Sequence, residues 1–524
     1  VHADAGAGDD LEGVRRGGLG PGPHAWAARS VMALYHATSP RGTTTQSPDQ
    51  PSLLEEAKPA RGKPSRGCAL VCVAVSSVGL FAFGVTSARA SANLDLRLNQ
   101  ASGEIQALQA EGDQRRATVL GQPSNDGNAL ADYNGMRWVL SHLTASFPPP
   151  SWERERPELP SDIDAMTQQL APGGTLQGPV VLSDYDGLYD SLLVGIDPFQ
   201  VSAGGGADEY AASLAFYKQV RPLRRYLRDA LARGKCDWQV SWERAAYDTD
   251  LYSLFCVANV FAYEASQEPP REAVQAGLEL VAFGQDVCRH GTGGGVLMGI
   301  QISKIGFLSL AHTLGRSGLD RVDYRRVLQA LETYRAPAIE EVIAALRRVA
   351  LVKALQTSGR PLDTSQGTSA SGGLLARLDL VQARELEALD VLVERATRVA
   401  QLPPGEGTVE AASGEVSLED SSISAFASEL RASLGLARAT RALAAAHLVR
   451  LETGSFPRVI SGLHEHLSEE ELRDPSAATP SPLGYRLEGE LLHCWIRGAD
   501  AVDAGGKGVA PRSDDETLQT RVPR

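Results

Sequence analysis

Four aspartates between residues 184 and 197 form a close group of carboxylates in this 524-residue chain. Asp184, Asp186 and Asp190 belong to the sequence Asp-Tyr-Asp-Gly-Leu-Tyr-Asp, and Asp197 follows them. Paired carboxylates can act as general acid and base or hold a divalent cation. The spacing does not fit an EF-hand loop, which places glycine sixth and glutamate twelfth. We expect a turn in which the aspartates cap backbone N–H groups, with an aspartate-dependent hydrolase as the alternative.

Two further pairs resemble metal-binding or nucleophilic pairs, but their members are two residues apart. His464 and His466 are separated by one glutamate, and Cys288 precedes His290. On a helix, side chains at i and i+2 point in different directions, so we expect exposed polar surface at the histidines. The glycine run after His290 lacks the Lys-Ser/Thr of a phosphate loop and is typical of a helix end. His312, in an apolar stretch, is expected to be a core histidine. The sequence thus assigns no catalytic, cofactor-binding or metal-binding residue.

A membrane anchor is the strongest prediction from this sequence. Residues 67–88 carry no charge, and as a helix they would reach about 33 Å, enough for a hydrocarbon core of about 30 Å. Basic residues are denser before this segment than after it, which predicts that the N-terminus lies in the cytoplasm and the long C-terminal portion on the other side of the membrane. A signal peptide cleaved near Ala88-Arg89-Ala90 is the alternative. The long apolar stretch and the long leader, even if Met32 is the true start, favour an uncleaved span.

Composition favours helices and argues against a nucleic-acid partner. The net charge is −13, and only 6% of the residues are aromatic, against 43% hydrophobic overall. A nucleic-acid partner would require a basic face, and the scarcity of aromatic residues disfavours sheets. Cys236, Cys256, Cys288 and Cys494 would lie outside the cell membrane, where disulfides persist. Their spacing fits no metal site. The sequence is compatible both with disulfides among these cysteines and with buried free thiols.

Helical periodicity dominates the chain beyond the anchor, and proline or glycine marks the ends of its segments. Pro269-Pro270 predicts a helix start, and the apolar segment 296–314, with Lys304 at its middle, predicts a buried core helix rather than a second span. Other helices are expected at 129–143, 214–231, 251–263, 327–334, 339–352, 374–400 and 423–451.

The predicted fold is mainly α: one transmembrane helix, an extracytoplasmic helical bundle or irregular solenoid, and a small C-terminal α+β module. The boundaries are a disordered cytoplasmic tail (1–66), the transmembrane helix (67–88), a juxtamembrane amphipathic or coiled-coil helix (89–120), a helical domain (121–356), a linker (357–373), further helices (374–453), the α+β module (454–508) and a disordered tail (509–524).

The C-terminal module changes from helix to hairpin chemistry. A long helix is followed by Gly454-Ser-Phe-Pro, by Asp474-Pro, and by alternating apolar residues on both sides of Glu488-Gly489-Glu490. This order resembles the globular end of the major type II secretion pseudopilins over Thr440 to Gly508. The resemblance implies a calcium site at Asp500 and Asp503, and a solvated acidic loop is the alternative. The aromatic-glycine pair usual after Asp-Pro is missing and the membrane segment is not fused to this helix, so the chain is not itself a pseudopilin subunit.

A wider resemblance links the chain to uncharacterised envelope proteins of planctomycetes and related high-GC bacteria. It is carried by Cys236-Asp237-Trp238, by the long helix pairs and by the Gly-x-Phe-Pro, Asp-Pro and Tyr-Arg ending. Those proteins have no assigned activity. The resemblance therefore implies an architecture and a location, the bacterial inner membrane with the bulk of the chain in the periplasm. We expect a non-catalytic, membrane-anchored scaffold that binds envelope proteins, with an accessory of a secretion apparatus as an alternative. No cofactor is expected.

Overall fold

The computed structural model describes residues 89, 92, 96, 125–143, 159–170, 219–238, 251–289, 293–332, 334, 336–337, 418–477, 480–497 and 516–521. Most of these residues are helical, as predicted. In chain order the elements are β1 (Asn125–Asn128), α3 (Leu130–Leu143), α4 (Ile163–Leu170), η3 (Arg221–Leu223), α8 (Arg224–Ala232), β2 (Arg233–Lys235), α9 (Leu251–Gln267), α10 (Pro270–Cys288), α11 (Gly293–Leu314), α12 (Arg321–Glu332), α16 (Leu418–Thr453), η4 (Ile460–Leu463), β3 (Gly484–Glu488), β4 (Leu491–Ile496) and β5 (Glu516–Arg521).

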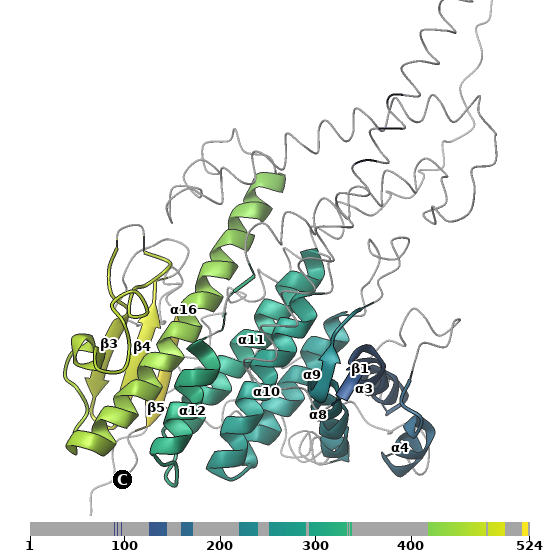
Figure 1. Ribbon diagram of the computed structural model, residues 1–524, viewed down its shortest axis with the longest axis horizontal. Helices are drawn as coiled ribbons and strands as arrows, with labels where there is room; N and C mark the ends of the chain where they lie inside the picture. Colours follow the sequence, from purple (N-terminus) through teal and green to yellow (C-terminus); the bar gives the residue numbers. More distant parts are fainter. Residues whose placement is uncertain are drawn as a thin grey trace, which may run out of the picture.

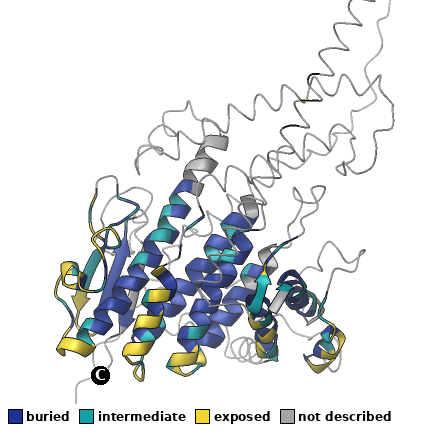
Figure 2. Ribbon diagram, viewed as in Figure 1, coloured by how far each residue is buried: buried dark blue, intermediate teal, exposed yellow. Residues whose placement is uncertain are grey.

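The helices stand side by side, with a three-stranded sheet at one end of the row (Figure 1). α10 and α11 form the central pair, and α9 packs against both of them. On one side, α3 contacts α4 and α8, and the parallel pair β1–β2 joins the residues before α3 to those after α8. On the other side, α16 contacts α11 and α12 as well as β4 and β5. Because α16 contributes to both the helical core and the sheet, one continuous apolar core runs through the described part of the chain (Figure 2).

Glycines allow α10 and α11 to approach closely. Gly277 and Gly284 on α10 are seven residues apart, and so are Gly299 and Gly306 on α11. A Cβ atom on Gly284 would lie 2.5 Å from the backbone oxygen of Gly299, and one on Gly306 would lie 2.8 Å from the backbone nitrogen of Val281. Such distances leave no room for a side chain, so glycine is required where the two backbones cross.

Helix α11 is buried in the fold, as the sequence predicts. Among the described residues, its segment Gly295–Leu314 is the one helix long and apolar enough to cross a membrane, and 83% of its most apolar window is buried inside the protein. Lys304 at its middle is fully buried. Burial by α9, α10 and α16 therefore accounts for its apolar sequence. The predicted anchor at 67–88 lies outside the described residues.

The start of the helical domain differs from the prediction in two ways. The helix expected over 214–231 is interrupted within the described residues by the 3-10 turn η3, where Pro222 supplies no N–H, and α8 begins only at Arg224. The short parallel pair β1–β2 was not predicted. The Asn128 side chain reinforces this pair, donating to the Asp237 carbonyl (2.8 Å) and accepting from its backbone N–H (2.9 Å). α10 begins at Pro270 as expected. α12 begins at Arg321, six residues before the helix expected over 327–334, and α4 was not predicted.

The C-terminal module is an antiparallel sheet packed on α16. The predicted hairpin is confirmed, with β3 and β4 in register from Gly484–Trp495 to Glu488–Leu491. The disordered tail predicted for 509–524 is wrong for β5, which pairs with β4 from Leu491–Arg521 to Ile496–Glu516. Only Leu518 in this strand is a large apolar residue, so its alternation was too weak to predict a strand. α16, at Leu418–Thr453, is longer than the helix expected over 423–451.

Candidate functional site

Several of the sequence-derived candidate residues lie outside the described residues. These are the aspartate group at 184–197, the calcium candidates Asp500 and Asp503, and His290. Hydrolysis at the aspartate group and calcium binding therefore stay predictions. Among the residues that the structure describes, no group of three or more His, Cys, Asp or Glu side chains could hold a metal ion.

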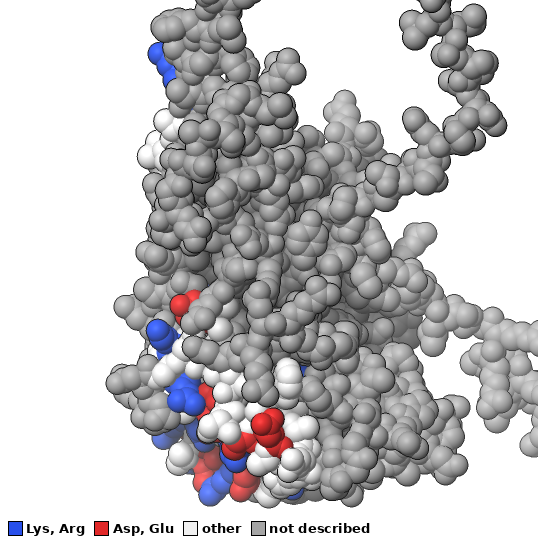
Figure 3. All heavy atoms as spheres, turned by 90° about the vertical axis from the view of Figure 1, so that its right-hand side faces the viewer, with Lys and Arg blue, Asp and Glu red and all other residues white. Residues whose placement is uncertain are grey.

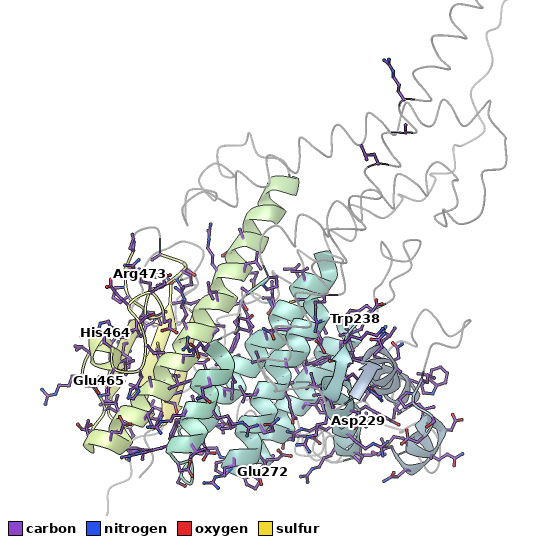
Figure 4. All side chains as sticks on the ribbon, in the orientation of Figure 1. Asp229, Trp238, Glu272, His464, Glu465 and Arg473 are labelled. Atoms are coloured by element: carbon purple, nitrogen blue, oxygen red, sulfur yellow. The ribbon has the colours of Figure 1, made fainter. Side chains whose placement is uncertain are left out.

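The remaining histidine and cysteine candidates do not come together. His464 is exposed at the outer margin of the C-terminal module, in a turn after η4 rather than on a helix (Figure 4). His466 is half-buried, with Nε2 3.1 Å from Oε2 of Glu452. His312 is half-buried on α11, so it is less enclosed than expected.

Three of the cysteines are buried in separate parts of the fold. Among the described cysteines, Cys236, Cys288 and Cys494 are thiols outside any disulfide. Cys288 ends α10, and its Sγ donates to the carbonyl of Val296 over 3.5 Å. Burial raises the pKa of the Cys494 thiol, and Asp474 adds to that shift. A buried thiol with a raised pKa is unreactive, which favours a packing role.

Among the described residues, a group of charged side chains is centred on the buried Arg224, at the start of α8. Arg224 is 4% exposed and donates from Nη1 to Glu268 (2.5 Å) and from Nη2 to Glu279 (3.1 Å). Arg228 Nε donates to the other oxygen of Glu279 over 3.2 Å. These contacts join α8 to the end of α9 and to α10. We call Arg224, Arg228, Glu264, Glu268 and Glu279 the Arg224 cluster.

Glu264 is the unusual member of the Arg224 cluster. It lies on α9 and is 6% exposed, and neither of its carboxylate oxygens hydrogen-bonds to a residue that the structure describes. Burial raises its pKa to about 8, against an ordinary value of 4.5, while Arg224 and Arg221 oppose the shift and Glu268 adds to it. At neutral pH this carboxyl therefore holds a proton, since desolvation disfavours the charged form.

A second polar cluster lies between α11 and α16. Lys304 Nζ is 2.8 Å from Oε2 of Glu429, and Gln301 Nε2 donates to the same oxygen over 2.9 Å. Nearby, the hydroxyls of Tyr334 and Ser433 are 2.6 Å apart. Burial raises the pKa of the Tyr334 phenol, and its hydrogen bond with Ser433 and the charge of Lys304 oppose the shift. We call these five residues the Lys304 cluster.

A third contact network fixes α3 against the end of α10. The Tyr133 hydroxyl donates to Oδ2 of Asp286 over 2.5 Å, and the Trp238 indole N–H donates to the Asp286 backbone carbonyl over 2.7 Å. The rings of Tyr133 and Trp238 stack with centroids 5.3 Å apart. Asp286 is fully buried. The Cys236-Asp237-Trp238 sequence thus places its tryptophan in the core between α3 and α10 (Figure 4).

The buried members of these groups join helices, and Glu264 can in addition bind a proton. The sequence placed Lys304 on a core helix, but none of these contacts was predicted, because the partners lie far apart in the chain. One signal was present: Glu264 directly follows the apolar run 251–263 on the same helix. A carboxylate so placed is expected to enter the core.

Comparison of the whole chain with protein-family models, with curated proteins and with solved structures gives no match.

Proposed function

We propose that this chain is a membrane-anchored extracytoplasmic scaffold or interaction protein, held by a single span at 67–88 with its bulk in the periplasm of a bacterium. The observation that carries the proposal is the position of α16. This helix packs on α11 and α12 with part of its surface and on β4 and β5 with another part. Because α16 is shared by the helical core and the C-terminal sheet, it fixes the position of one relative to the other, as a scaffold requires.

The use of buried charge agrees with a scaffold. Arg224 joins α8 to α9 and α10, and Lys304 joins α11 to α16. On the face formed by α3, α4 and α8, basic and acidic side chains are intermixed over the described residues (Figure 3), including Arg225, which pairs with Asp162 and Asp229. Basic charge compensated in this way favours protein partners over nucleic acid.

The anchor is tested by carbonate extraction of cells that express the full chain. We expect the wild-type chain to stay in the membrane pellet. Leu80→Arg/Phe81→Arg should release it, because two charges at the centre of a span cost about 2.5 to 3.5 kcal/mol each. Leu53→Arg/Leu54→Arg, two matched changes in the leader, should leave it in the pellet. Release of the intact wild-type chain overturns the proposed anchor.

The scaffold role is tested by chemical cross-linking in intact cells followed by purification in detergent. A scaffold should be linked to the same defined neighbours in the wild-type chain and in Asp184→Ala/Asp186→Ala/Asp190→Ala. Recovery of the chain without any reproducible neighbour contradicts the proposal. Loss of a hydrolytic activity in the triple variant would support the envelope hydrolase instead.

A second candidate function, an accessory of a secretion apparatus, is favoured by the construction of the C-terminal module. After the long helix α16, the Tyr485 hydroxyl donates to the carbonyl of Pro457 over 3.1 Å, which ties the Gly-x-Phe-Pro turn to β3. Asp474 accepts the backbone N–H of Arg497 over 3.0 Å, which ties the Asp-Pro step to the end of β4. Secretion components among the cross-linked neighbours would support this function, and their absence would remove it.

A further inference from the structure

We propose that Glu264 is a proton-binding switch that couples the packing of η3 and α8 on α9 and α10 to the pH of the surroundings. With a proton on Glu264 the four elements pack tightly, and loss of that proton favours their separation. The proposal stands whether or not the chain is an anchored scaffold.

Glu264 is a buried acid, and its potential hydrogen-bond donor, Arg224, already donates to other carboxylates. Arg224 is the buried cation whose charge reaches Glu264. Its guanidinium already donates from Nη1 to Glu268 and from Nε and Nη2 to Oε2 of Glu279. The second cation, Arg221, has a side chain that is 67% exposed and lies 3.6 Å from Glu268. An ionised Glu264 would therefore be a third carboxylate beside one buried guanidinium.

The charged groups on the other elements packed against α9 have partners of their own. On α10, Glu279 accepts from Arg224, Arg228 and Gln275. Beyond the end of α11, Arg316 donates to the backbone carbonyl of Ser266 over 3.3 Å. On α3, Asp132 pairs with Arg233 at 2.9 Å. Within the part of the chain that the structure describes, these bonds leave the proton as the means of neutralising Glu264.

The proton on Glu264 matters for packing because Arg224 holds the elements together. Its bonds to Glu268 and Glu279 connect α8 to the end of α9 and to the middle of α10. When α8 separates from α9, Glu264 meets water and recovers its ordinary affinity for protons. The packed form then binds the proton more tightly than the separated form. Raising the pH therefore favours separation, and lowering it favours packing.

The expected size of the effect follows from the proton affinities of Glu264 in the packed and in the separated form. Between about pH 4.5 and about pH 8 the packed form keeps the proton while the separated form has lost it. In that window the equilibrium constant for separation rises about tenfold per pH unit. Above about pH 8 both forms are ionised and the dependence ends. From about pH 6 to about pH 8 the constant should rise by up to about a hundredfold.

Hydrogen exchange of the full-length chain in detergent, followed by mass spectrometry, tests the switch. After correction for the intrinsic pH dependence of exchange, amides of residues 221–232 should lose protection between about pH 6 and about pH 8. Glu264→Gln cannot ionise, so its protection should be equal at the two pH values. Glu272→Gln, which changes an exposed glutamate on α10 (Figure 4), should behave as the wild type.

Two results would overturn the proposal: equal protection of the wild type at both pH values, or the same loss of protection in Glu264→Gln. If that variant does not fold, infrared spectroscopy of the wild type decides instead. A protonated carboxyl band that disappears with a midpoint near pH 8, as the raised pKa of Glu264 requires, supports the switch. The absence of any such band at about pH 6, where an ordinary carboxyl is already ionised, refutes it.

Discussion

Nζ of Lys304, on α11, lies 2.8 Å from Oε2 of Glu429, on α16, and the two ends of this ion pair differ in their surroundings. The Lys304 side chain is fully buried, whereas the Glu429 side chain is 24% exposed. A buried charge that loses its partner stays desolvated, but a partly exposed charge can be hydrated. The two ends of the pair are therefore not equivalent in their effect on stability.

Removal of the carboxylate should cost more than removal of the ammonium. We expect Glu429→Leu to lower the free energy of unfolding by about 3 to 5 kcal/mol, because it leaves a charged lysine in the core. Lys304→Met should cost only about 1 kcal/mol, since methionine has a similar volume and Glu429 can contact water. Urea unfolding followed by circular dichroism measures both. The double variant should be more stable than Glu429→Leu alone, and an additive loss would contradict this account.

The crossing of α10 and α11 predicts a steric effect at Gly284. In Gly284→Ala, the new Cβ atom would lie 2.5 Å from the backbone oxygen of Gly299 and 2.6 Å from the backbone nitrogen of Ser303. Backbone atoms cannot move aside as a side chain can, so we expect a loss of about 3 kcal/mol. Gly489→Ala is the control: it has φ of 61° and nothing within 4 Å, so only backbone strain of about 1 kcal/mol is expected. Similar losses in the two variants, measured by thermal unfolding, would show that the crossing can relax.

Local sequence signals predicted α3, α9, α10, α11 and α16, because the physical causes of these helices are local. Pro270 begins α10 as expected, and the apolar segment around Lys304 is a core helix. Proline position and hydrophobic periodicity depend on neighbours within a few residues. The hairpin around Gly489 was predicted for the same reason.

Pairings between distant parts of the chain were not predicted. β5 exists because β4 offers it an edge, and its own sequence carries little alternation. The parallel pair β1–β2 depends on contacts between residues 125 and 233, which no local pattern reports. The same holds for the Arg224 cluster, since Arg224 and Glu279 are 55 positions apart. Spacing along the sequence drew attention to carboxylates and histidines that are neighbours in the chain. It could not report buried charges whose partners are distant in the chain.

Asp474 is expected to stabilise the C-terminal module through two backbone hydrogen bonds. Its Oδ1 accepts from the N–H of Ser476 over 2.8 Å and its Oδ2 from the N–H of Arg497 over 3.0 Å, with only 6% of the residue exposed. Asp474→Ala would bury these N–H groups without their acceptor, at a cost of about 3 kcal/mol. Hydrogen exchange of the β4 amides and urea unfolding should both report the loss.

An exposed aspartate offers a matched control for Asp474. Oδ1 of Asp320 also accepts two backbone N–H groups, those of Val322 and Asp323, at the start of α12. Its side chain is 50% exposed, so water can replace the lost acceptor. Asp320→Ala should therefore destabilise the protein clearly less than Asp474→Ala does. An equal cost for both variants would mean that burial adds nothing at Asp474.

His447 is buried in a neutral form between α12, α16 and β5. Its ring stacks on Tyr324 with centroids 5.2 Å apart, and Phe456 meets its edge at 5.0 Å. Burial lowers its pKa to about 3 from 6.5, and the charge of Arg450 adds to the shift. The unfolded chain binds a proton at this histidine between about pH 6.5 and about pH 3, whereas the folded chain does not. Stability from this group is therefore lost as the pH falls through that window.

Glu264 acts in the opposite direction, and the two groups together predict the shape of the stability profile. Because burial raises the pKa of Glu264 to about 8, its effect lowers stability as the pH rises from about 4.5 to about 8. Each slope is about 1.4 kcal/mol per pH unit. Between about pH 4.5 and about pH 6.5 the two slopes cancel. Stability governed by these two groups should thus be constant there and fall on both sides.

Single substitutions separate the two limbs of this profile. His447→Phe keeps the stacking on Tyr324 and cannot titrate, so it should flatten the acid side and leave the alkaline side unchanged. Glu264→Gln should do the reverse and raise the melting temperature above about pH 7, because the folded chain then holds no buried carboxyl that must ionise. Thermal unfolding of both variants from about pH 3 to about pH 9 makes the comparison. If either variant shifts the whole curve without changing its shape, the group concerned contributes packing and not the proton linkage described here.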